Sequence, residues 1–390
     1  MNRAWKRWVP AAAVPALIAA GVLAGSIPAR AGDPLPQKSP AEVLTLLGQH
    51  SSRTFSGTLE QVSHLGLPEL PAGPPSSGPV SAGGPASIIE LLTGEHTARI
   101  FMDGPAKMRV QVMDRLAERD VIRRDHDVWF YNSKDNSAAH VTLPDVASDL
   151  PLPGKDGSSA DPSTKAIPTP EDLATKFLAK VDSSTAVTVG PEARVAGRSA
   201  YSLELAPRTE GTLLAKVVIA VDGQTGMPLK VTVSARGQSE PAFEAGYTSL
   251  SLAAPEDATF NFAAPPGATV KELQTPPMPS KSALPAKPGM ATPEHTPGAS
   301  PDARHHDGPR PAVTGTGWET VVGFPAPADG QKAQASESLL KDPLLSQAAV
   351  VVPGGRLLSS SLVNVLLTND GRIFVGMVPA DRLQAAAGAA

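Results

Sequence analysis

The chain has 390 residues, which is enough for two domains of ordinary size. Its net charge of −4 gives no electrostatic reason to bind nucleic acid or an anionic membrane surface. The sequence contains no cysteine, which excludes disulfides, thiolate metal sites, thiol nucleophiles and a lipid-modified N-terminal cysteine. Its 41 prolines indicate folded segments that are separated by proline-rich connections.

Residues 1–31 are predicted to be an export signal. The basic residues between Arg3 and Arg7 precede an apolar stretch, and Ala29 and Ala31 fit the small-residue rule for cleavage. We therefore predict cleavage after Ala31. The alternative is a retained signal that anchors the chain, although the apolar stretch is short for a spanning helix of about 17–25 residues. With either outcome, the remaining chain is expected to be extracytoplasmic.

Two short helices are predicted, each with a capping residue followed by a proline. One begins at Ser39-Pro40-Ala41-Glu42 and ends near Gly48, and the other begins at Thr169-Pro170-Glu171-Asp172 and ends near Val181. A serine or threonine cap, a proline in the first helical position and an acidic residue three positions after the cap are typical of a helix start.

The clearest β pattern is a pair of strands with strict alternation of apolar and polar residues. Thr97–Met102 and Lys107–Val112 alternate in this way, and Asp103–Pro105 forms a turn between them. Further strands are predicted near residues 54–63, 117–123, 128–132, 138–143, 201–205, 216–221, 229–233 and 242–252.

Proline-rich segments divide the chain. Two long loops are predicted at residues 66–87 and 144–170 inside a main domain of residues 39–272, and a linker is predicted at residues 273–311. A small C-terminal α+β unit is expected at residues 312–390. Its predicted elements are a strand at 318–324, a weak helix at 332–346, a hairpin of 357–367 with 373–378, and a short helix from Pro379.

No catalytic pattern is found in the sequence. Gly-x-Ser-x-Gly is absent, and Gly190–Ser199 has too long a glycine spacing for a phosphate loop, with Arg198 in place of the lysine. The histidines near His305 lie in the linker, where no scaffold fixes a metal geometry. We therefore predict that the chain is not an enzyme and holds no cofactor or metal.

A basic cluster follows the alternating strands, and its arginines are interleaved with acidic residues. The interpretation we favour is an exposed strand face with cross-strand ion pairs, and a partner-binding surface is the alternative. The cluster consists of Arg115, Arg119, Arg123 and Arg124.

Several motifs occur in the order that they have in the LolA family of outer-membrane lipoprotein carriers. Val128-Trp129-Phe130-Tyr131-Asn132 resembles the Trp-Phe-Tyr-Asn strand of these carriers. Three other motifs follow the same order: Phe55-Ser56-Gly57, Gly104-Pro105 before the next strand, and Phe260-Asn261-Phe262 before Pro265-Pro266-Gly267. The resemblance covers about residues 40–271, and the RseB family of sigma-factor regulators is about equally similar. The carriers' latch arginine is replaced by Gly104, so that latch is not carried over.

The resemblance implies an α+β fold in which an incomplete antiparallel β-barrel wraps around two or more helices. It also implies an apolar cavity between sheet and helices that accepts acyl chains. The residues expected to line this cavity are Ile100, Met102, Met108, Val110, Val112, Trp129, Tyr131, Leu203 and Leu205. Which side of each strand faces the cavity is left open.

The function expected from these observations is non-enzymatic binding of lipid or acylated protein outside the cytoplasm. The alternative is an envelope signalling module that binds a membrane protein, such as an anti-sigma factor. Nucleic acid is not expected as a partner.

Overall fold

The computed structural model describes residues 34–51, 53–66, 94–114, 117–143, 168–273, 311–326 and 349–389. The predicted export signal, the loop after residue 66, the loop before residue 168, the linker and the helix at 332–346 fall on residues outside these ranges. The chain divides into two compact units, Met1–Gln37 and Lys38–Ala390, and every element below belongs to the second. Within the described ranges, no helix has the length and apolarity that crossing a bilayer requires.

The first half of the main sheet is a run of antiparallel strands, in which each strand after the first is joined to the next by a short connection. All of the strands predicted here form; the second begins three residues earlier than predicted, and the other boundaries agree within two residues. They are β1 (Thr54–Ser63), β2 (Gly94–Asp103), β3 (Lys107–Asp114), β4 (Ala117–Arg124), β5 (Asp127–Asn132) and β6 (Ser137–Thr142).

The second half of the main sheet contains the predicted strands and two short ones that the sequence analysis missed, β7 and β8. A final strand, β13, was also missed, and it pairs with β6 in parallel. The strands are β7 (Thr185–Val189), β8 (Ala193–Val195), β9 (Arg198–Pro207), β10 (Leu214–Asp222), β11 (Pro228–Ala235), β12 (Phe243–Ser251) and β13 (Thr269–Leu273).

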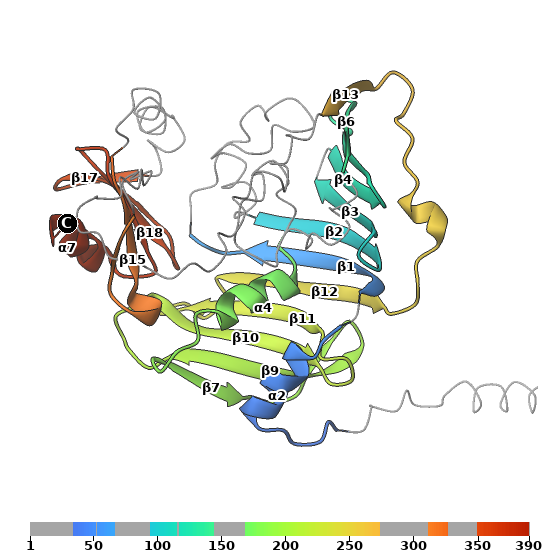
Figure 1. The fold of residues 1–390 in the computed structure, drawn as a ribbon. Helices are drawn as coiled ribbons and strands as arrows, with labels where there is room; N and C mark the ends of the chain where they lie inside the picture. The colour runs from blue at the N-terminus through green and yellow to red at the C-terminus, as the bar shows by residue number, and fades with distance from the viewer. Residues whose placement is uncertain are drawn as a thin grey trace, which may run out of the picture. The chain divides into compact units, whose positions relative to one another are not determined.

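These strands form one 13-stranded sheet in the described chain, in the order β13-β6-β5-β4-β3-β2-β1-β12-β11-β10-β9-β7, with β8 paired to β9. The pairing does not return from β7 to β13, so the sheet is open (Figure 1). The predicted fold class, an incomplete antiparallel barrel with helices, is therefore confirmed.

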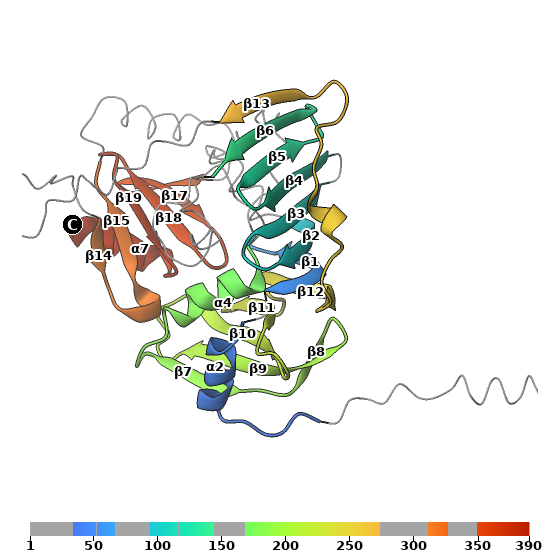
Figure 2. The same ribbon diagram turned by 45° about the vertical axis from the view of Figure 1, so that its right-hand side comes forward.

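Two capped helices pack on the β7–β11 half of the sheet. α2 (Pro40–Gly48) lies on β7 and β9, and α4 (Pro170–Leu178) lies on β10 and β11 (Figures 1 and 2). Both have the predicted capping box, in which Ser39 or Thr169 accepts from a backbone N–H three residues on. α4 ends at Leu178, three residues before the predicted end.

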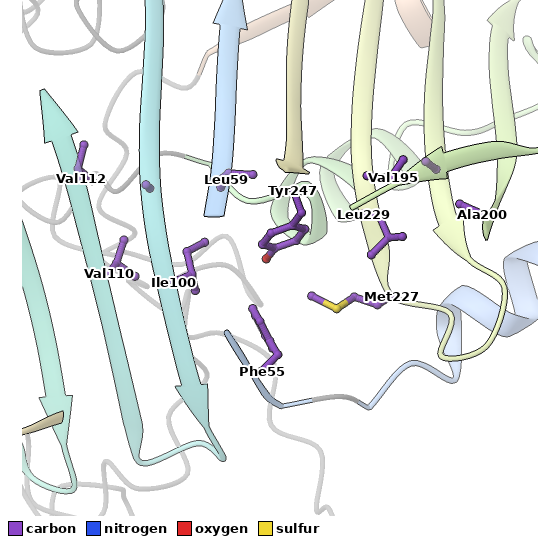
Figure 3. Packing of buried hydrophobic residues seen from close by; sticks show 12 residues of the cluster. Phe55, Leu59, Ile100, Val110, Val112, Val195, Ala200, Met227, Leu229 and Tyr247 are labelled. Carbon is purple, nitrogen blue, oxygen red and sulfur yellow. The ribbon is translucent and has the colours of Figure 1, made fainter. Parts of the chain in front are cut away.

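The two faces of the β1–β6 half have different surroundings. We call the face that carries Leu59, Ala98 and Val112 the core face, because these residues belong to one buried apolar cluster. Figure 3 shows how the cluster continues from β2 and β3 through Tyr247 to Leu229 on β11. Phe55 meets the ring of Tyr247 edge-on at 6.0 Å between centroids.

The opposite face is crossed by the segment between β12 and β13, residues 252–268, which we call the strap (Figure 2). It contains the short 3-10 helix η4 (Asp257–Phe260). Asp257 binds Lys107 Nζ at 2.6 Å and Arg124 Nη2 at 2.8 Å. Arg109 Nη1 donates to the carbonyl of Thr259 at 3.2 Å. We call this side the strap face.

The C-terminal residues form a separate sheet with six strands in the described chain, ordered β14-β15-β19-β18-β17-β16. Its strands are β14 (Ala312–Thr314), β15 (Val321–Phe324), β16 (Ala349–Val352), β17 (Gly355–Ser359), β18 (Asn364–Thr368) and β19 (Ile373–Gly376). The helix α7 (Ala380–Ala389) follows and buries Leu383 and Ala387 against this sheet.

Three details of this unit differ from the prediction. Trp318 lies in the 3-10 helix η6 (Gly317–Glu319) and not in a strand. The segment 357–367, predicted as one strand, is divided between β17 and β18, because Ser360 Oγ accepts from the backbone N–H of Val363 and closes a turn. β14 and β16 were missed, since each has only three or four residues and no alternation.

Candidate functional site

Five of the nine predicted lining residues lie together on the core face. The register pairs Ala98 with Val112, Ile100 with Val110 and Met102 with Met108 across β2 and β3. Ile100, Val110 and Val112 are buried (Figure 3). Met102 and Met108 are partly buried and pack against the same cluster.

Leu203 and Leu205 also lie on the core face, but at the far end of the sheet. They pair with Ile219 and Val217 of β10, and the register continues through β11 and β12 to β1. Both leucines are 0% exposed. This end of the core face is thus filled by its own side chains.

Trp129 and Tyr131 do not join the other seven, because they point to the strap face. Trp129 packs on Phe262 of the strap at 5.3 Å between ring centroids, and Tyr131 packs on Phe262 at 5.7 Å. The residue between them, Phe130, lies on the core face.

Three core-face residues were missed by the sequence analysis. Phe130 pairs with Val121, which pairs with Val110, and Val128 lies two residues before Phe130 on the same face. All three are partly exposed. The signal was present, since Val128 and Phe130 alternate with Trp129, but a single alternating strand does not identify its buried side.

Partly exposed apolar residues lie on the core face of β2 to β5, on either side of Arg123, which is opposite Met108 on one side and Val128 on the other. We call the surface that they form the apolar patch, and it consists of Met102, Met108, Val121, Val128 and Phe130. The patch contrasts with the β9–β11 end of the same face, where Leu203, Ile219 and Leu229 are completely buried. Among the described residues, apolar side chains of the core face are thus partly exposed at its β2–β5 end and buried at its β9–β11 end.

The predicted basic cluster is divided between the two faces. Arg119 and Arg123 lie on the core face, opposite Val112 and Met108. Arg124 lies on the strap face, where it binds Asp257 and Asn261. Arg115 is outside the described residues. The predicted single exposed face is therefore wrong for the three described arginines.

The strap face carries a buried ion pair next to the strap. Arg109 Nη2 donates to Asp120 Oδ2 at 2.7 Å, and the side chain of Asp120 is almost completely buried. Burial raises the pKa of Asp120 above its ordinary value, although the Arg109 guanidinium offsets part of that rise. The pair ties β3 to β4 beneath the strap.

Two other kinds of candidate site, a surface hollow and a metal site, have less support. An open hollow of about 320 Å³ lies beside α2, lined by Lys38, Ala41, Glu42, Thr45, Leu46 and Gln49. It is flanked by a single helix and brings together no pair of groups suited to catalysis. In the described part of the chain, no three acidic or histidine side chains are arranged to hold a metal ion. The expected absence of enzyme activity, cofactor and metal stays a prediction.

A polar and aromatic contact joins the C-terminal sheet to the main sheet. Trp318 is 5% exposed, and its indole Nε1 donates to Thr185 Oγ1 at 2.8 Å. Its ring lies 6.3 Å from that of Phe177 on α4. The backbone N–H of Leu213 donates to the carbonyl of Met377 at 2.8 Å. Residues at the starts of β7 and β10 therefore form part of the surface that the C-terminal sheet contacts.

No family model matches the chain, and no curated protein does either. Among solved structures, it is similar to the MucA/MucB complex of Pseudomonas aeruginosa at 17% identity, covering 89% of this chain and 96% of that chain, with a TM-score of 0.39. A LolA-superfamily protein from Nitrosomonas europaea matches at 12% identity over 58% of this chain and 99% of that chain, with a TM-score of 0.21.

A lipoprotein-sorting protein domain from Vibrio parahaemolyticus, described as putative, is also similar to the chain. It matches at 12% identity over 57% of this chain and 96% of that chain, with a TM-score of 0.20.

Proposed function

We propose that this chain is a non-enzymatic extracytoplasmic binding protein for lipid or acylated protein, and that an acyl chain lies against the apolar patch. The observation that carries the proposal is the contrast along the core face. Leu203, Ile219 and Leu229 at the β9–β11 end are completely buried, whereas Met102, Met108 and Phe130 are partly exposed around the side chain of Arg123.

Such a surface suits a ligand whose affinity comes from methylene groups. Each methylene group removed from water contributes about 0.8 kcal/mol, so one acyl chain needs no polar chemistry to bind. The proposal keeps Met102 and Met108 from the predicted lining and adds Val121, Val128 and Phe130. It leaves out Leu203 and Leu205, which are part of the packed core.

The experiment that tests the proposal compares two methionines of the same strand that lie on opposite faces. Met108 is on the core face, and Met113 is on the strap face with similar partial burial. We expect Met108→Gln to weaken binding of a pyrene-labelled fatty acid at least threefold, because the amide cannot replace the lost apolar contact. Met113→Gln should leave the affinity unchanged. Titration by fluorescence measures both.

Equal weakening in both variants, or binding that Met108→Gln does not change, would show that the patch is not the acyl site. Circular dichroism and thermal unfolding of each variant separate a lost contact from a lost fold. Mass spectrometry of lipids extracted from protein purified from its native envelope then identifies the natural ligand.

A second candidate function is an envelope signalling module that binds a membrane protein, such as an anti-sigma factor. It is favoured by the valines exposed on the two edge strands of the C-terminal sheet. Val313 on β14 is 64% exposed, and Val350 and Val351 on β16 are 66% and 77% exposed. Exposed apolar residues on an edge strand favour strand addition by a partner. A protein that purifies without lipid would favour this second function.

A further inference from the structure

Tyr247 of β12 places a polar group inside the apolar cluster of the core face. Its side chain is 4% exposed, and its ring meets that of Phe55 edge-on at 6.0 Å between centroids. Figure 3 shows the hydroxyl at the far end of the ring from β12, on the side where Phe55 and Met227 lie. Met227, Leu229 and Ile100 belong to the same buried cluster. The hydroxyl of Tyr247 therefore lies among apolar side chains.

The backbone around Tyr247 fixes the position of its ring. The register between β1 and β12 shifts after Thr58, so that Thr248 is opposite no residue of β1. An extra residue of this kind is a β-bulge, which changes the direction of the side chains beside it. The ring then lies next to Gly57, where a Cβ would come within 3.0 Å of Tyr247 Cδ1 and 2.7 Å of the carbonyl oxygen of Ser249. A glycine at this position makes room for the ring.

The hydroxyl of Tyr247 takes no part in holding the fold together. Within the described ranges it has no hydrogen-bond partner, and its oxygen is not fully enclosed. The hydroxyl of a buried tyrosine usually has a partner, because its lost hydration is otherwise not compensated. Tyr131 on the strap face follows this rule, since its hydroxyl donates to Asn136 Oδ1 at 3.2 Å. The hydroxyl of Tyr247 is thus available to a ligand.

The charged groups that act on this hydroxyl are both acidic. Glu171 and Asp172 lie in the first turn of α4, which packs on β10 and β11. Burial raises the pKa of Tyr247 above its ordinary value, and the two carboxylates raise it further. The hydroxyl therefore keeps its proton and can donate a hydrogen bond. The same two charges repel an anionic acceptor, so a neutral carbonyl suits this position better than a carboxylate.

Neighbouring side chains join Tyr247 to the apolar patch. Phe55 contacts the ring of Tyr247 and is opposite Met102 in the register of β1 and β2. Met102 is in turn opposite Met108 on β3. Both methionines pack against the cluster that contains Tyr247, and their unbranched side chains can adjust to a ligand. A chain that lies on the two methionines can thus continue past Phe55 to the hydroxyl.

We propose that the Tyr247 hydroxyl donates a hydrogen bond to the carbonyl oxygen of a neutral acyl ester or amide, whose chain lies on the apolar patch. This inference rests on the proposed function and adds the chemical class of the ligand. The apolar patch contributes affinity through methylene groups, which every acyl compound contains. The hydroxyl favours a ligand with a carbonyl over one without, because a ligand that lacks an acceptor leaves the donor unpaired.

Titration of two pyrene-labelled probes of equal chain length tests the inference. One probe is a fatty acid methyl ester and the other is an alkane, and both are delivered from cyclodextrin. We expect Tyr247→Phe to weaken binding of the ester about fivefold, as for the loss of one hydrogen bond, and to change binding of the alkane by less than about twofold. Tyr131→Phe is the matched control and should change neither affinity, because its hydroxyl bonds to Asn136 on the strap face.

Two further measurements separate contact with the ligand from a structural role. Without ligand, Tyr247→Phe should unfold at the same urea concentration as the unmodified chain, since its hydroxyl has no partner to lose. A lower midpoint would show that the hydroxyl bonds within the protein, which would contradict the inference. The infrared stretch of an isotope-labelled ester carbonyl should move to lower frequency on binding to the unmodified chain, and should move less in Tyr247→Phe.

An unchanged affinity for the ester in Tyr247→Phe, or an equal loss for both probes, would overturn the inference. Met108→Gln tests the proposed function separately, and it should weaken both probes alike because it removes apolar contact alone. If Met108→Gln does so and Tyr247→Phe does not distinguish the probes, the inference fails and the proposed function stands. If Met108→Gln changes neither probe, the proposed function fails and the inference fails with it.

Discussion

Trp318→Ala is expected to destabilise the attachment of the C-terminal sheet by about 3–5 kcal/mol, the usual cost of removing a buried tryptophan side chain. Trp318 is 5% exposed although it lies in a 3-10 turn, since its ring is buried against Phe177 and Thr185 of the main domain. The substitution removes the ring contact and leaves the Thr185 hydroxyl without its donor. No residue near Trp318 on η6 can fill the space, because Gly317 precedes it and Glu319 follows it.

The measurement is calorimetry of the unmodified chain and the variant. We expect the two sheets to unfold together in the unmodified chain, and the C-terminal sheet to unfold at a lower temperature in Trp318→Ala. Trp318→Phe is the matched control, because it keeps most of the apolar contact and loses the hydrogen bond, which is worth about 1 kcal/mol. A loss below about 1 kcal/mol in Trp318→Ala would show that the backbone contacts at Met377 suffice.

Those backbone contacts explain why the expected effect is large without being a complete loss of the interface. Thr212 Oγ1 donates to the carbonyl of Met377 at 2.7 Å, and the backbone N–H of Gly211 donates to Glu319 Oε1 at 2.9 Å. Glu319 in turn pairs with Arg382 of α7. Each of these hydrogen bonds contributes about 1 kcal/mol, which is less than burial of the tryptophan ring contributes.

Local patterns were sufficient to predict the parts of the fold that local physics determines. The alternation in Lys107–Val112 predicted β3, because strand side chains point to opposite faces in turn. The capping residues Ser39 and Thr169 predicted both helix starts, because each satisfies a backbone N–H that has no helical partner. These signals lie within a few residues of the structure that they specify.

The missed features depend on contacts that are distant in sequence. β13 forms because β6 offers a free edge about 130 residues earlier in the chain, and its own sequence shows no alternation in burial. Trp129 faces the strap because Phe262 lies there, and no property of Trp-Phe-Tyr identifies which face that is. For the candidate site, the alternation therefore placed the lining residues of β2 and β3 on one face. It could not show that Trp129 and Tyr131 lie on the opposite face.

Arg198→Met is expected to destabilise the main sheet by about 3–5 kcal/mol at pH 7, because it leaves the carboxylate of Asp222 buried without a cation. Asp222 is 1% exposed, and its carboxylate accepts hydrogen bonds from Arg198 Nε at 2.7 Å and from Arg198 Nη2 at 2.9 Å. Thr225 donates to the same carboxylate through its backbone N–H and its hydroxyl. The pair closes the β10–β11 turn against the start of β9.

The pH dependence of this variant follows from the pKa of Asp222. Burial by itself raises that pKa, but the hydrogen bonds from Arg198 and Thr225 outweigh burial and hold the pKa below its ordinary value. A carboxyl with a lowered pKa in the folded state stabilises the fold above its unfolded pKa, and this contribution is lost as the pH falls through the folded value. In Arg198→Met the burial of Asp222 remains while the hydrogen bonds from the guanidinium are lost, so the pKa of Asp222 should rise.

Urea unfolding at pH 7 and pH 4 measures both effects. We expect the deficit of Arg198→Met to be largest at pH 7 and to shrink at pH 4, where Asp222 can take up a proton instead of remaining a buried charge. The double variant Arg198→Met with Asp222→Asn should recover most of the lost stability at pH 7, since it removes the uncompensated charge and keeps the contacts with Thr225. A deficit of the same size at both pH values would mean that the loss comes from packing of the arginine stem and not from the charge of Asp222.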